Sequence, residues 1–142
     1  MTTRTSAAAW HGDLKGGEGE LSFGSGAFSG AYTYASRFEE GEGTNPEELL
    51  AAAHAACYSM SLANLLAKDG TPATSVRTDA TAHLETVDGG PKITRIELVT
   101  VGSVPGIDGA AFETKAAAAK TACPVSQLFA GAEIEVTATL EG

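Results

Sequence analysis

Two cysteines are the residues of this chain best suited to chemistry. Cys57 stands in a run of alanines, and Cys123 is followed directly by a proline. Thiols act as nucleophiles when ionised, and a pair of them can pass between dithiol and disulfide. The two positions are 123 − 57 = 66 residues apart, so they form no Cys-x-x-Cys motif. A disulfide requires the fold to bring their Cα atoms within about 7 Å. Structural, redox-active and nucleophilic roles therefore stay open.

A nucleophilic Cys57 needs a positive charge nearby, because burial among alanines raises the pKa of a thiol and makes it inert. Arg37 is the only basic residue between Lys15 and Lys68. Arginine stays protonated when partly buried and favours a thiolate beside it. The alternative is that Arg37 pairs at the surface with one of the acids that follow it, Glu39, Glu40 or Glu42.

Cys123 has a different predicted environment. Pro124 ends one helical segment and can open the next, which places Cys123 at a helix N-terminus. Free backbone N–H groups and the helix dipole favour a thiolate there. This position suits a thiol that must attack or leave.

His54 offers an alternative chemistry for Cys57. It lies three residues before Cys57, so both side chains share roughly one helical face, and a Cys57–His54 pair could serve a hydrolase or transferase. A hydrogen-bonded core histidine is the favoured interpretation. Zinc held by His54, Cys57 and Cys123 is a remote alternative. His11 and His83 fall in expected strands at no ligand spacing, and we interpret both as structural or surface residues.

A long helix is predicted to carry His54 and Cys57. Asn45-Pro46 and the acids Glu47 and Glu48 are typical of a helix start, and Asp69-Gly70 is typical of its end. Acids in the first turn stabilise a helix by about 0.3–1 kcal/mol each, and either one could also orient Arg37. Because this helix is apolar nearly all the way round, it is a core helix that a small domain cannot surround alone. This favours an intimate homodimer.

The remaining pattern predicts an α+β fold in one domain, residues 1–142. Nine of the 17 glycines lie in the first 43 residues, which is typical of short strands and tight turns. Strands, helix, strands, helices and strand in that order favour antiparallel sheets. The elements expected after the long helix are strands 76–87 and 92–101, a second helix 111–122 capped by Asp108, a short helix 125–130 and a strand 133–140.

Charge and composition exclude several classes of function. The net charge of −9 repels nucleic acids and anionic membrane surfaces, so neither is an expected partner. The wholly apolar runs are far shorter than the ~20 residues of a membrane span. The N-terminus lacks the apolar block of a secretory signal, which favours a cytoplasmic protein. Motifs for nucleotide binding, zinc proteolysis and serine hydrolysis do not occur in the sequence.

Five segments taken together resemble the OsmC/Ohr family of thiol-dependent hydroperoxide reductases, and more closely its OsmC branch. They appear in the family's order and cover most of the chain. The segments are Ser36-Arg37-Phe38-Glu39, Gly43-Thr44-Asn45-Pro46-Glu47-Glu48-Leu49, Ala53-His54-Ala55-Ala56-Cys57, Val104-Pro105-Gly106-Ile107-Asp108 and Ala122-Cys123-Pro124-Val125-Ser126. The resemblance implies an intertwined α+β homodimer that acts in stress defence.

The resemblance also implies a mechanism. Cys57 attacks the peroxide and becomes a sulfenic acid, and Cys123 condenses with it to a disulfide. Arg37 stabilises the thiolate and polarises the peroxide, and Glu47 holds Arg37. A dithiol reductant, plausibly lipoyl-like in such families, restores both thiols. No metal, haem, flavin or other cofactor is implied.

Helix geometry and the residues around Cys57 each add one expectation to the resemblance. Glu47 and Cys57 are ten residues apart in one helix, about 15 Å along its axis, so the Glu47 that serves a given Cys57 is predicted to come from the partner chain. Apolar residues around Cys57 favour organic hydroperoxides over hydrogen peroxide. These residues are Phe38, Leu50, Met60 and Ile107. The competing hypothesis is a non-catalytic protein that binds a small hydrophobic ligand.

Overall fold

The computed structural model describes residues 2–131 and 133–142. The chain divides into two compact units, one ending at Leu49 and one running from Leu50 to Gly142. Each unit is described by itself, and the single domain expected over residues 1–142 stays a prediction.

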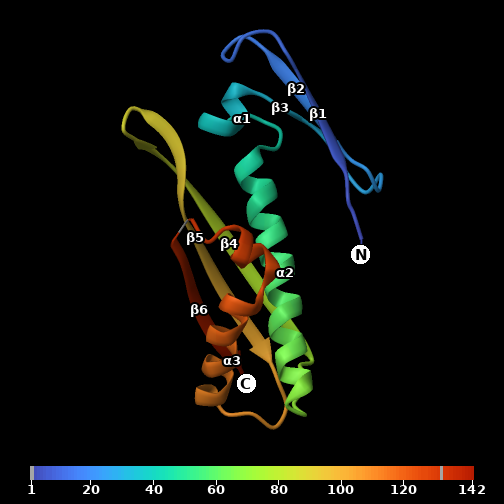
Figure 1. Ribbon diagram of the computed structural model, residues 1–142, viewed down its shortest axis with the longest axis vertical. Coiled ribbons are helices and arrows are strands. Elements are labelled where there is room, and N and C mark those ends of the chain that lie inside the picture. The colour runs from blue at the N-terminus through green and yellow to red at the C-terminus, as the bar shows by residue number, and fades with distance from the viewer. Residues whose placement is uncertain (1, 132) are drawn as a thin grey trace. The chain divides into compact units, whose positions relative to one another are not determined.

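The first unit contains a three-stranded antiparallel sheet in the order β1-β2-β3 (Figure 1). Its strands are β1 (Ser6–His11), β2 (Glu18–Phe23) and β3 (Ser29–Tyr32). The prediction of short strands in the glycine-rich region is confirmed. Gly19 shows why glycine is needed here, because a Cβ at this position would come within 2.7 Å of the Trp10 and Tyr32 rings.

A short helix, α1 (Tyr34–Phe38), follows the first sheet and was not predicted. The Thr33 side chain accepts a hydrogen bond from the Ser36 amide, and the Ser36 hydroxyl accepts one from the Thr33 amide. This reciprocal capping box satisfies two of the free amides at the helix start. The Ser36 hydroxyl also donates to the Thr44 carbonyl at 2.8 Å, which ties the loop after α1 to the helix that carries Arg37.

The long helix α2 (Pro46–Lys68) has the predicted ends. The Asn45 side chain accepts a hydrogen bond from the Glu48 amide at 2.8 Å and caps the first turn. Gly70 has φ +81°, the left-handed conformation that glycine supplies after the last helical turn. The prediction from the cap residues is therefore confirmed at both ends.

By length and composition alone, α2 could cross a membrane, contrary to the expectation from short apolar runs. A core helix of a soluble protein meets the same criteria. Three of its large side chains are completely buried within the second unit, namely Tyr58, Leu62 and Leu66. The part of α2 that carries these three side chains therefore belongs to the core, whereas only 22% of the apolar window of α2 is buried.

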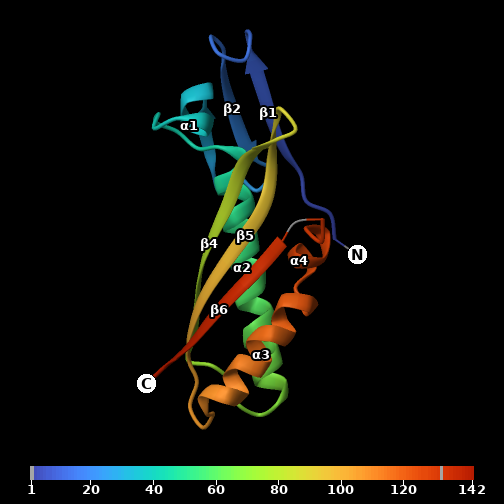
Figure 2. The ribbon, with the colours of Figure 1, turned by 90° about the vertical axis from the view of Figure 1, so that its left-hand side faces the viewer.

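The second unit packs α2 and α3 against one face of a three-stranded sheet (Figure 2). Its further elements are β4 (Ser75–Val87), β5 (Gly90–Ser103), α3 (Gly109–Ala122), α4 (Pro124–Leu128) and β6 (Glu133–Glu141). Every one of these elements lies within two residues of its predicted bounds. Asp108 caps α3 as expected, since its carboxylate accepts a hydrogen bond from the Ala111 amide at 2.8 Å.

One part of the fold prediction is wrong. The sheets were expected to be antiparallel, and β4 and β5 do form an antiparallel hairpin, but β6 runs parallel to β5. The helices α3 and α4 carry the chain back along the sheet, so β6 begins beside Arg95 near the start of β5 and runs in the same direction. A parallel neighbour requires such a helical crossover.

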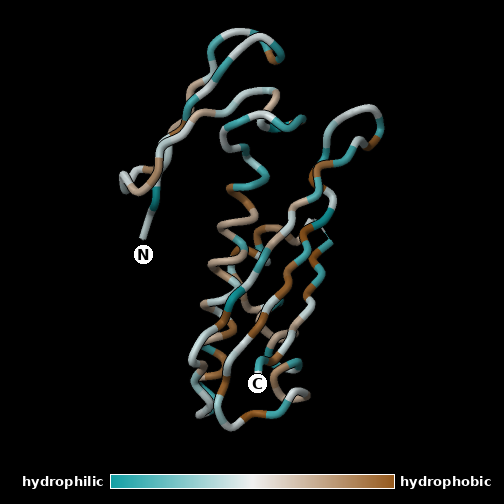
Figure 3. Tube along the Cα trace, turned by 180° about the vertical axis from the view of Figure 1, so that it is seen from behind, coloured by the Kyte–Doolittle hydropathy of each residue, from teal (hydrophilic) through white to brown (hydrophobic). Residues whose placement is uncertain are grey.

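The sheet has one buried and one wet face, as its alternating sequence predicted. Figure 3 shows hydrophobic positions alternating with polar ones along these strands. The buried face of β5 presents Ile96 and Leu98 to the helices. On the other face, the Glu97 carboxylate accepts from Arg95 Nη2 at 2.5 Å and lies 3.2 Å from His83 Nε2. His83 thus lies in a partly exposed network of polar contacts with Arg95 and Glu97.

Gly102 allows α3 to approach the sheet closely. A Cβ at this position would lie 2.4 Å from Cε1 of Phe112, whose side chain is completely buried. We expect Gly102→Ala to lower the free energy of unfolding by about 1–3 kcal/mol through overpacking, measured by urea denaturation. Gly90→Ala, in the same strand with no neighbouring atom within 4 Å, is the matched control. Equal effects of the two substitutions would contradict this account.

Candidate active site

The fold brings the two cysteines together. Cys57 lies on α2, and Cys123 is the residue at which α3 ends and α4 begins. Their sulfur atoms are 3.1 Å apart, and both are free thiols. Cys123 is completely buried, whereas Cys57 is only partly buried. The sequence left open whether two cysteines that are 66 residues apart meet. They do meet, and both belong to the second unit.

Hydrogen bonds distinguish the two thiols electrostatically. Burial raises the pKa of Cys57, and its hydrogen bond with Cys123 raises it further. Burial opposes ionisation of Cys123 as well, but the Cys57 thiol and the polar groups of Ser126 and Val125 at the start of α4 lower the pKa of Cys123 below its usual range. Within the second unit, negative charge therefore resides more readily on Cys123. The predicted place of Cys123 before a helix is confirmed.

His54 is completely buried and bonds to Ser126. Its Nε2 lies 2.7 Å from the Ser126 hydroxyl, and Phe129 packs edge-on against the imidazole with 5.4 Å between ring centres. Burial lowers the pKa of His54, so the ring is neutral near pH 7. This arrangement agrees with the hydrogen-bonded core histidine favoured by the sequence.

Sequence reasoning missed Ser126. The signal was present in its spacing, because Ser126 is the third residue after Cys123 and occupies the position whose amide faces the residue that caps α4. The side chain is buried, with 4% of its surface exposed. Among the residues that the structure describes, no three His, Cys, Asp or Glu side chains are arranged to hold a metal ion.

Arg37 and Glu47 form a close ion pair in the first unit. Arg37 Nη2 donates to Glu47 Oε1 at 2.7 Å, and Nε lies 3.1 and 3.2 Å from the two carboxylate oxygens. The Glu47 side chain is 9% exposed and that of Arg37 is 34% exposed. Glu48 instead accepts a hydrogen bond from the Thr44 hydroxyl. The pairing fixes the plane of the guanidinium and leaves its Nη1 outside these contacts.

A small apolar pocket lies in the second unit. Its volume is about 210 Å³, and its lining residues are Leu50, Ile93, Ile96, Leu128, Phe129 and Gly131. Of the apolar residues expected around Cys57, Leu50 lines this pocket. Ile107 packs against the hydrophobic core, and Met60 is 75% exposed. The fourth, Phe38, belongs to the first unit.

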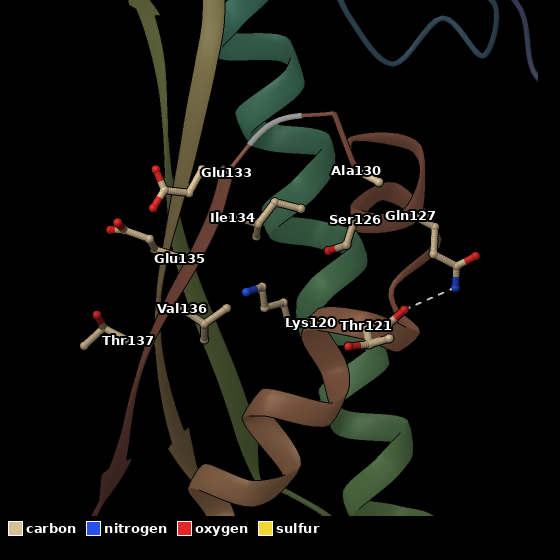
Figure 4. A pocket seen from close by; sticks show the side chains of 10 residues that line it. All are labelled: Lys120, Thr121, Ser126, Gln127, Ala130, Glu133, Ile134, Glu135, Val136 and Thr137. Atoms are coloured by element: carbon tan, nitrogen blue, oxygen red, sulfur yellow. Dashed lines mark hydrogen bonds between the residues drawn. The ribbon is translucent and has the colours of Figure 1, made fainter.

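A more open pocket of about 880 Å³ lies between the α3–α4 segment and β6 (Figure 4). Ile134 and Val136 point into it from β6, whereas Glu133 and Glu135 point away. Ser126 is on its wall and turns its hydroxyl toward α2. Neither cysteine lines this pocket.

Comparison with known proteins places the chain in a family. Residues 39–139 match the family model described as "OsmC-like protein". Peroxiredoxin OsmC of Escherichia coli strain K12 is 47% identical over 122 residues, which are 85% of each chain. The organic hydroperoxide resistance protein of Xanthomonas axonopodis pv. citri strain 306 is 37% identical over 101 residues, 70% of this chain and 68% of that one.

Solved structures share the fold at lower identity. An OsmC organic hydroperoxide resistance protein from Legionella pneumophila superimposes with a TM-score of 0.74 at 22% identity and covers 100% of both chains. OhrB of Bacillus subtilis gives 0.73 at 24% identity over 96% of this chain and 98% of its own. With the two thiols in contact, and with close relatives matched over most of the sequence, the chain belongs to the OsmC-like family.

Proposed function

We propose that this chain is a cysteine-based peroxidase that reduces organic hydroperoxides to alcohols. The observation that carries the proposal is the 3.1 Å contact between the sulfurs of Cys57 and Cys123. The names of its relatives, peroxiredoxin OsmC and organic hydroperoxide resistance protein, support the same activity. Two free thiols at this distance can become one disulfide with little movement of the backbone.

The proposed reaction has two steps on the protein. The Cys57 thiolate attacks the terminal oxygen of the hydroperoxide, the O–O bond breaks, and the alkoxide leaves as an alcohol after it takes up a proton. Cys57 is thereby oxidised to a sulfenic acid. The Cys123 sulfur then attacks Cys57, the S–O bond breaks, and a disulfide and water are formed. A lipoyl-like dithiol reductant reduces the disulfide and is itself oxidised.

Exposure supports Cys57 as the thiol that meets the peroxide. Cys57 is partly exposed, whereas Cys123 is completely buried. Because burial raises the pKa of Cys57, its thiolate needs a cation. We assign that role to Arg37, which polarises the peroxide as well. Glu47, through its two-point contact with the guanidinium, holds Arg37 in orientation.

A second copy of the chain is part of the proposal. Glu47 and Cys57 are ten residues apart on α2, about 15 Å along the helix axis. We therefore propose that Arg37 and Glu47 serve Cys57 of the partner chain in a homodimer. An exposed apolar stripe on α2 supports a partner there, since it runs along one face through Ala52, Ala56 and Met60.

A relative named organic hydroperoxide resistance protein supports an organic hydroperoxide as the substrate. The small apolar pocket has a volume of about 210 Å³, below the roughly 300–1,000 Å³ of typical ligand sites, and neither cysteine is among its lining residues. The same pocket is the observation that favours the second candidate, a non-catalytic protein that binds a small hydrophobic ligand. A reducing compartment keeps a dithiol reductant available, and we propose the cytoplasm as the location.

Oxidation should produce an intramolecular disulfide. One equivalent of cumene hydroperoxide should lower the intact mass of the reduced protein by about 2 Da with no added oxygen, because two thiol hydrogens are lost. Cys123→Ser should instead gain about 16 Da as Cys57 stops at the sulfenic acid. Dithiothreitol should reverse the parent's change. A parent protein that keeps an added oxygen would contradict the two-step reaction.

Peroxide turnover should depend on Cys57. Cys57→Ser should abolish the consumption of cumene hydroperoxide with dihydrolipoamide as reductant, since the serine hydroxyl is not ionised near pH 7. The parent should show a higher kcat/KM for cumene hydroperoxide than for hydrogen peroxide. If the parent consumed peroxide no faster than dihydrolipoamide alone, the binding-protein hypothesis would replace the enzyme, and if Cys57→Ser kept a parent rate above that background, Cys57 would not be the nucleophile. Equal kcat/KM for both peroxides would contradict the apolar substrate.

Mixing two variants tests the partner's contribution. In a dimer of Cys57→Ser and Glu47→Gln chains, one site receives an intact Cys57 from one chain and an intact Arg37–Glu47 pair from the other. After co-refolding, about half of the symmetric dimers are mixed, so activity should return to about a quarter of the parent's. Each variant refolded alone is the control. A mixture that only averages the two controls would show that both groups act within one chain.

A further inference from the structure

We infer that Lys15 determines substrate specificity by binding a carboxylate of the hydroperoxide, while Arg37 polarises the peroxide group. The preferred substrate is then an organic hydroperoxide whose apolar chain ends in a carboxylate. The inference rests on the proposed function, in which Arg37 acts on the peroxide, and it adds a second point of attachment for the same substrate.

Two cations and two aromatic rings contact one another in the first unit. Lys15 Nζ lies 5.8 Å from the centre of the Tyr34 ring. The centres of the Tyr34 and Phe38 rings are 4.8 Å apart. Arg37 Cζ in turn lies 5.3 Å from the centre of the Phe38 ring. These four side chains form the cation–aromatic cluster, which places Lys15 in the same connected group as the proposed peroxide-binding arginine.

The turn that carries Lys15 is held in one shape by its own hydrogen bonds. The Asp13 carboxylate accepts a hydrogen bond from the Gly16 amide at 2.6 Å. The Asp13 carbonyl accepts one from the Gly17 amide and one from the Trp10 indole, each at 3.0 Å. A Cβ at Gly17 would come within 2.4 Å of the Asp13 carbonyl oxygen, so the turn requires glycine there. The backbone of Lys15 therefore has a defined place beside the rings.

The ammonium of Lys15 is available for an anion. Lys15 is exposed and takes part in none of the ion pairs among residues 2–131 and 133–142. Arg37, in contrast, holds Glu47 through Nε and Nη2, and its Nη1 lies outside these contacts. In a chain with a net charge of −9, a cation without an acidic partner creates a local positive potential that attracts an anion.

The surface beside Lys15 is apolar. Tyr34 and Phe38 are only half-buried, and Leu14 is 59% exposed. An alkyl chain that covers this surface removes it from water, which is favourable. A carboxylate at the end of that chain meets the ammonium where rings and alkyl groups exclude water, so the two charges attract each other more strongly than in bulk water. The cation–aromatic cluster therefore fits an apolar chain with a terminal carboxylate.

The test changes only the charge at the far end of the substrate. The probes are 10-hydroperoxydecanoic acid and its methyl ester, and the reductant is dihydrolipoamide, which carries no carboxylate. The readout is the ratio of kcat/KM for the acid to kcat/KM for the ester. Lys15→Met should lower this ratio about 3-fold. The change should come from a higher KM for the acid at an unchanged kcat, because the contact is remote from the reacting oxygen.

Matched variants separate this contact from general charge effects. Lys15→Arg keeps a cation beside the Tyr34 ring and should keep the parent's ratio. Lys15→Glu should lower the ratio further than Lys15→Met does, because it repels the carboxylate. Lys92→Met removes one exposed positive charge from β5 in the second unit and should leave the ratio unchanged. Raising the salt concentration to about 0.5 M should reduce the difference between the parent and Lys15→Met, since salt screens an exposed charge pair.

Four outcomes would overturn the inference. Lys15→Met could keep the parent's ratio, or Lys92→Met could lower the ratio as much as Lys15→Met does. Lys15→Met could instead lose turnover of both probes equally together with its dimer on gel filtration, which would make Lys15 a contact of the partner chain. With the ester as peroxide, a preference of the parent for dihydrolipoic acid over dihydrolipoamide that Lys15→Met lacks would assign Lys15 to the reductant.

The same assays distinguish this inference from the proposed function. A parent that reduces neither probe would defeat the proposed function, and the inference with it. A parent that reduces both probes with a ratio that does not depend on Lys15 would leave the proposed function intact and defeat the inference alone.

Discussion

The proposed reaction depends on one contact between two sulfur atoms that come from distant parts of the chain. Cys57 approaches from the long helix, and Cys123 from the point at which one helix ends and the next begins. The 3.1 Å between the two sulfurs depends on how the two helices pack against each other, so neither helix determines the contact alone. The packing of α3 on the sheet, through Phe112 over Gly102, and the hydrogen bond from the Tyr58 hydroxyl to the Ala116 carbonyl keep both helices in place.

The two thiols differ in pKa because their surroundings differ. The polar groups of Val125 and Ser126, at the start of α4, lower the pKa of Cys123, which caps that helix. Cys57 sits within a regular helix whose amides are already paired, and burial raises its pKa. In the proposed reaction, this asymmetry suits Cys123 to attack and leaves Cys57 in need of a cation, the role that we propose for Arg37. Arg37 is itself held by the Glu47 carboxylate, whose side chain is nearly buried.

Local signals predicted the elements accurately because each is set by neighbours in the sequence. Asn45, Asp108 and Gly70 mark helix ends through interactions within a few residues, and alternation marks the strands. The direction of β6 could not be predicted in this way, since the path of α3 and α4 across the sheet decides it. The short helix at Tyr34–Phe38 was missed because its capping signal, Thr33 with Ser36, is only one turn long.

The sequence by itself determined which residues can react, where most helices and strands begin and end, and which family the chain resembles, since residue type and local spacing carry that information. Tertiary structure alone decided that Cys57 meets Cys123, that Arg37 chooses Glu47 over nearer acids, and that His54 bonds to Ser126. Contacts of the first and third kind join residues more than sixty positions apart. They depend on how helices pack on a sheet, which no local pattern specifies.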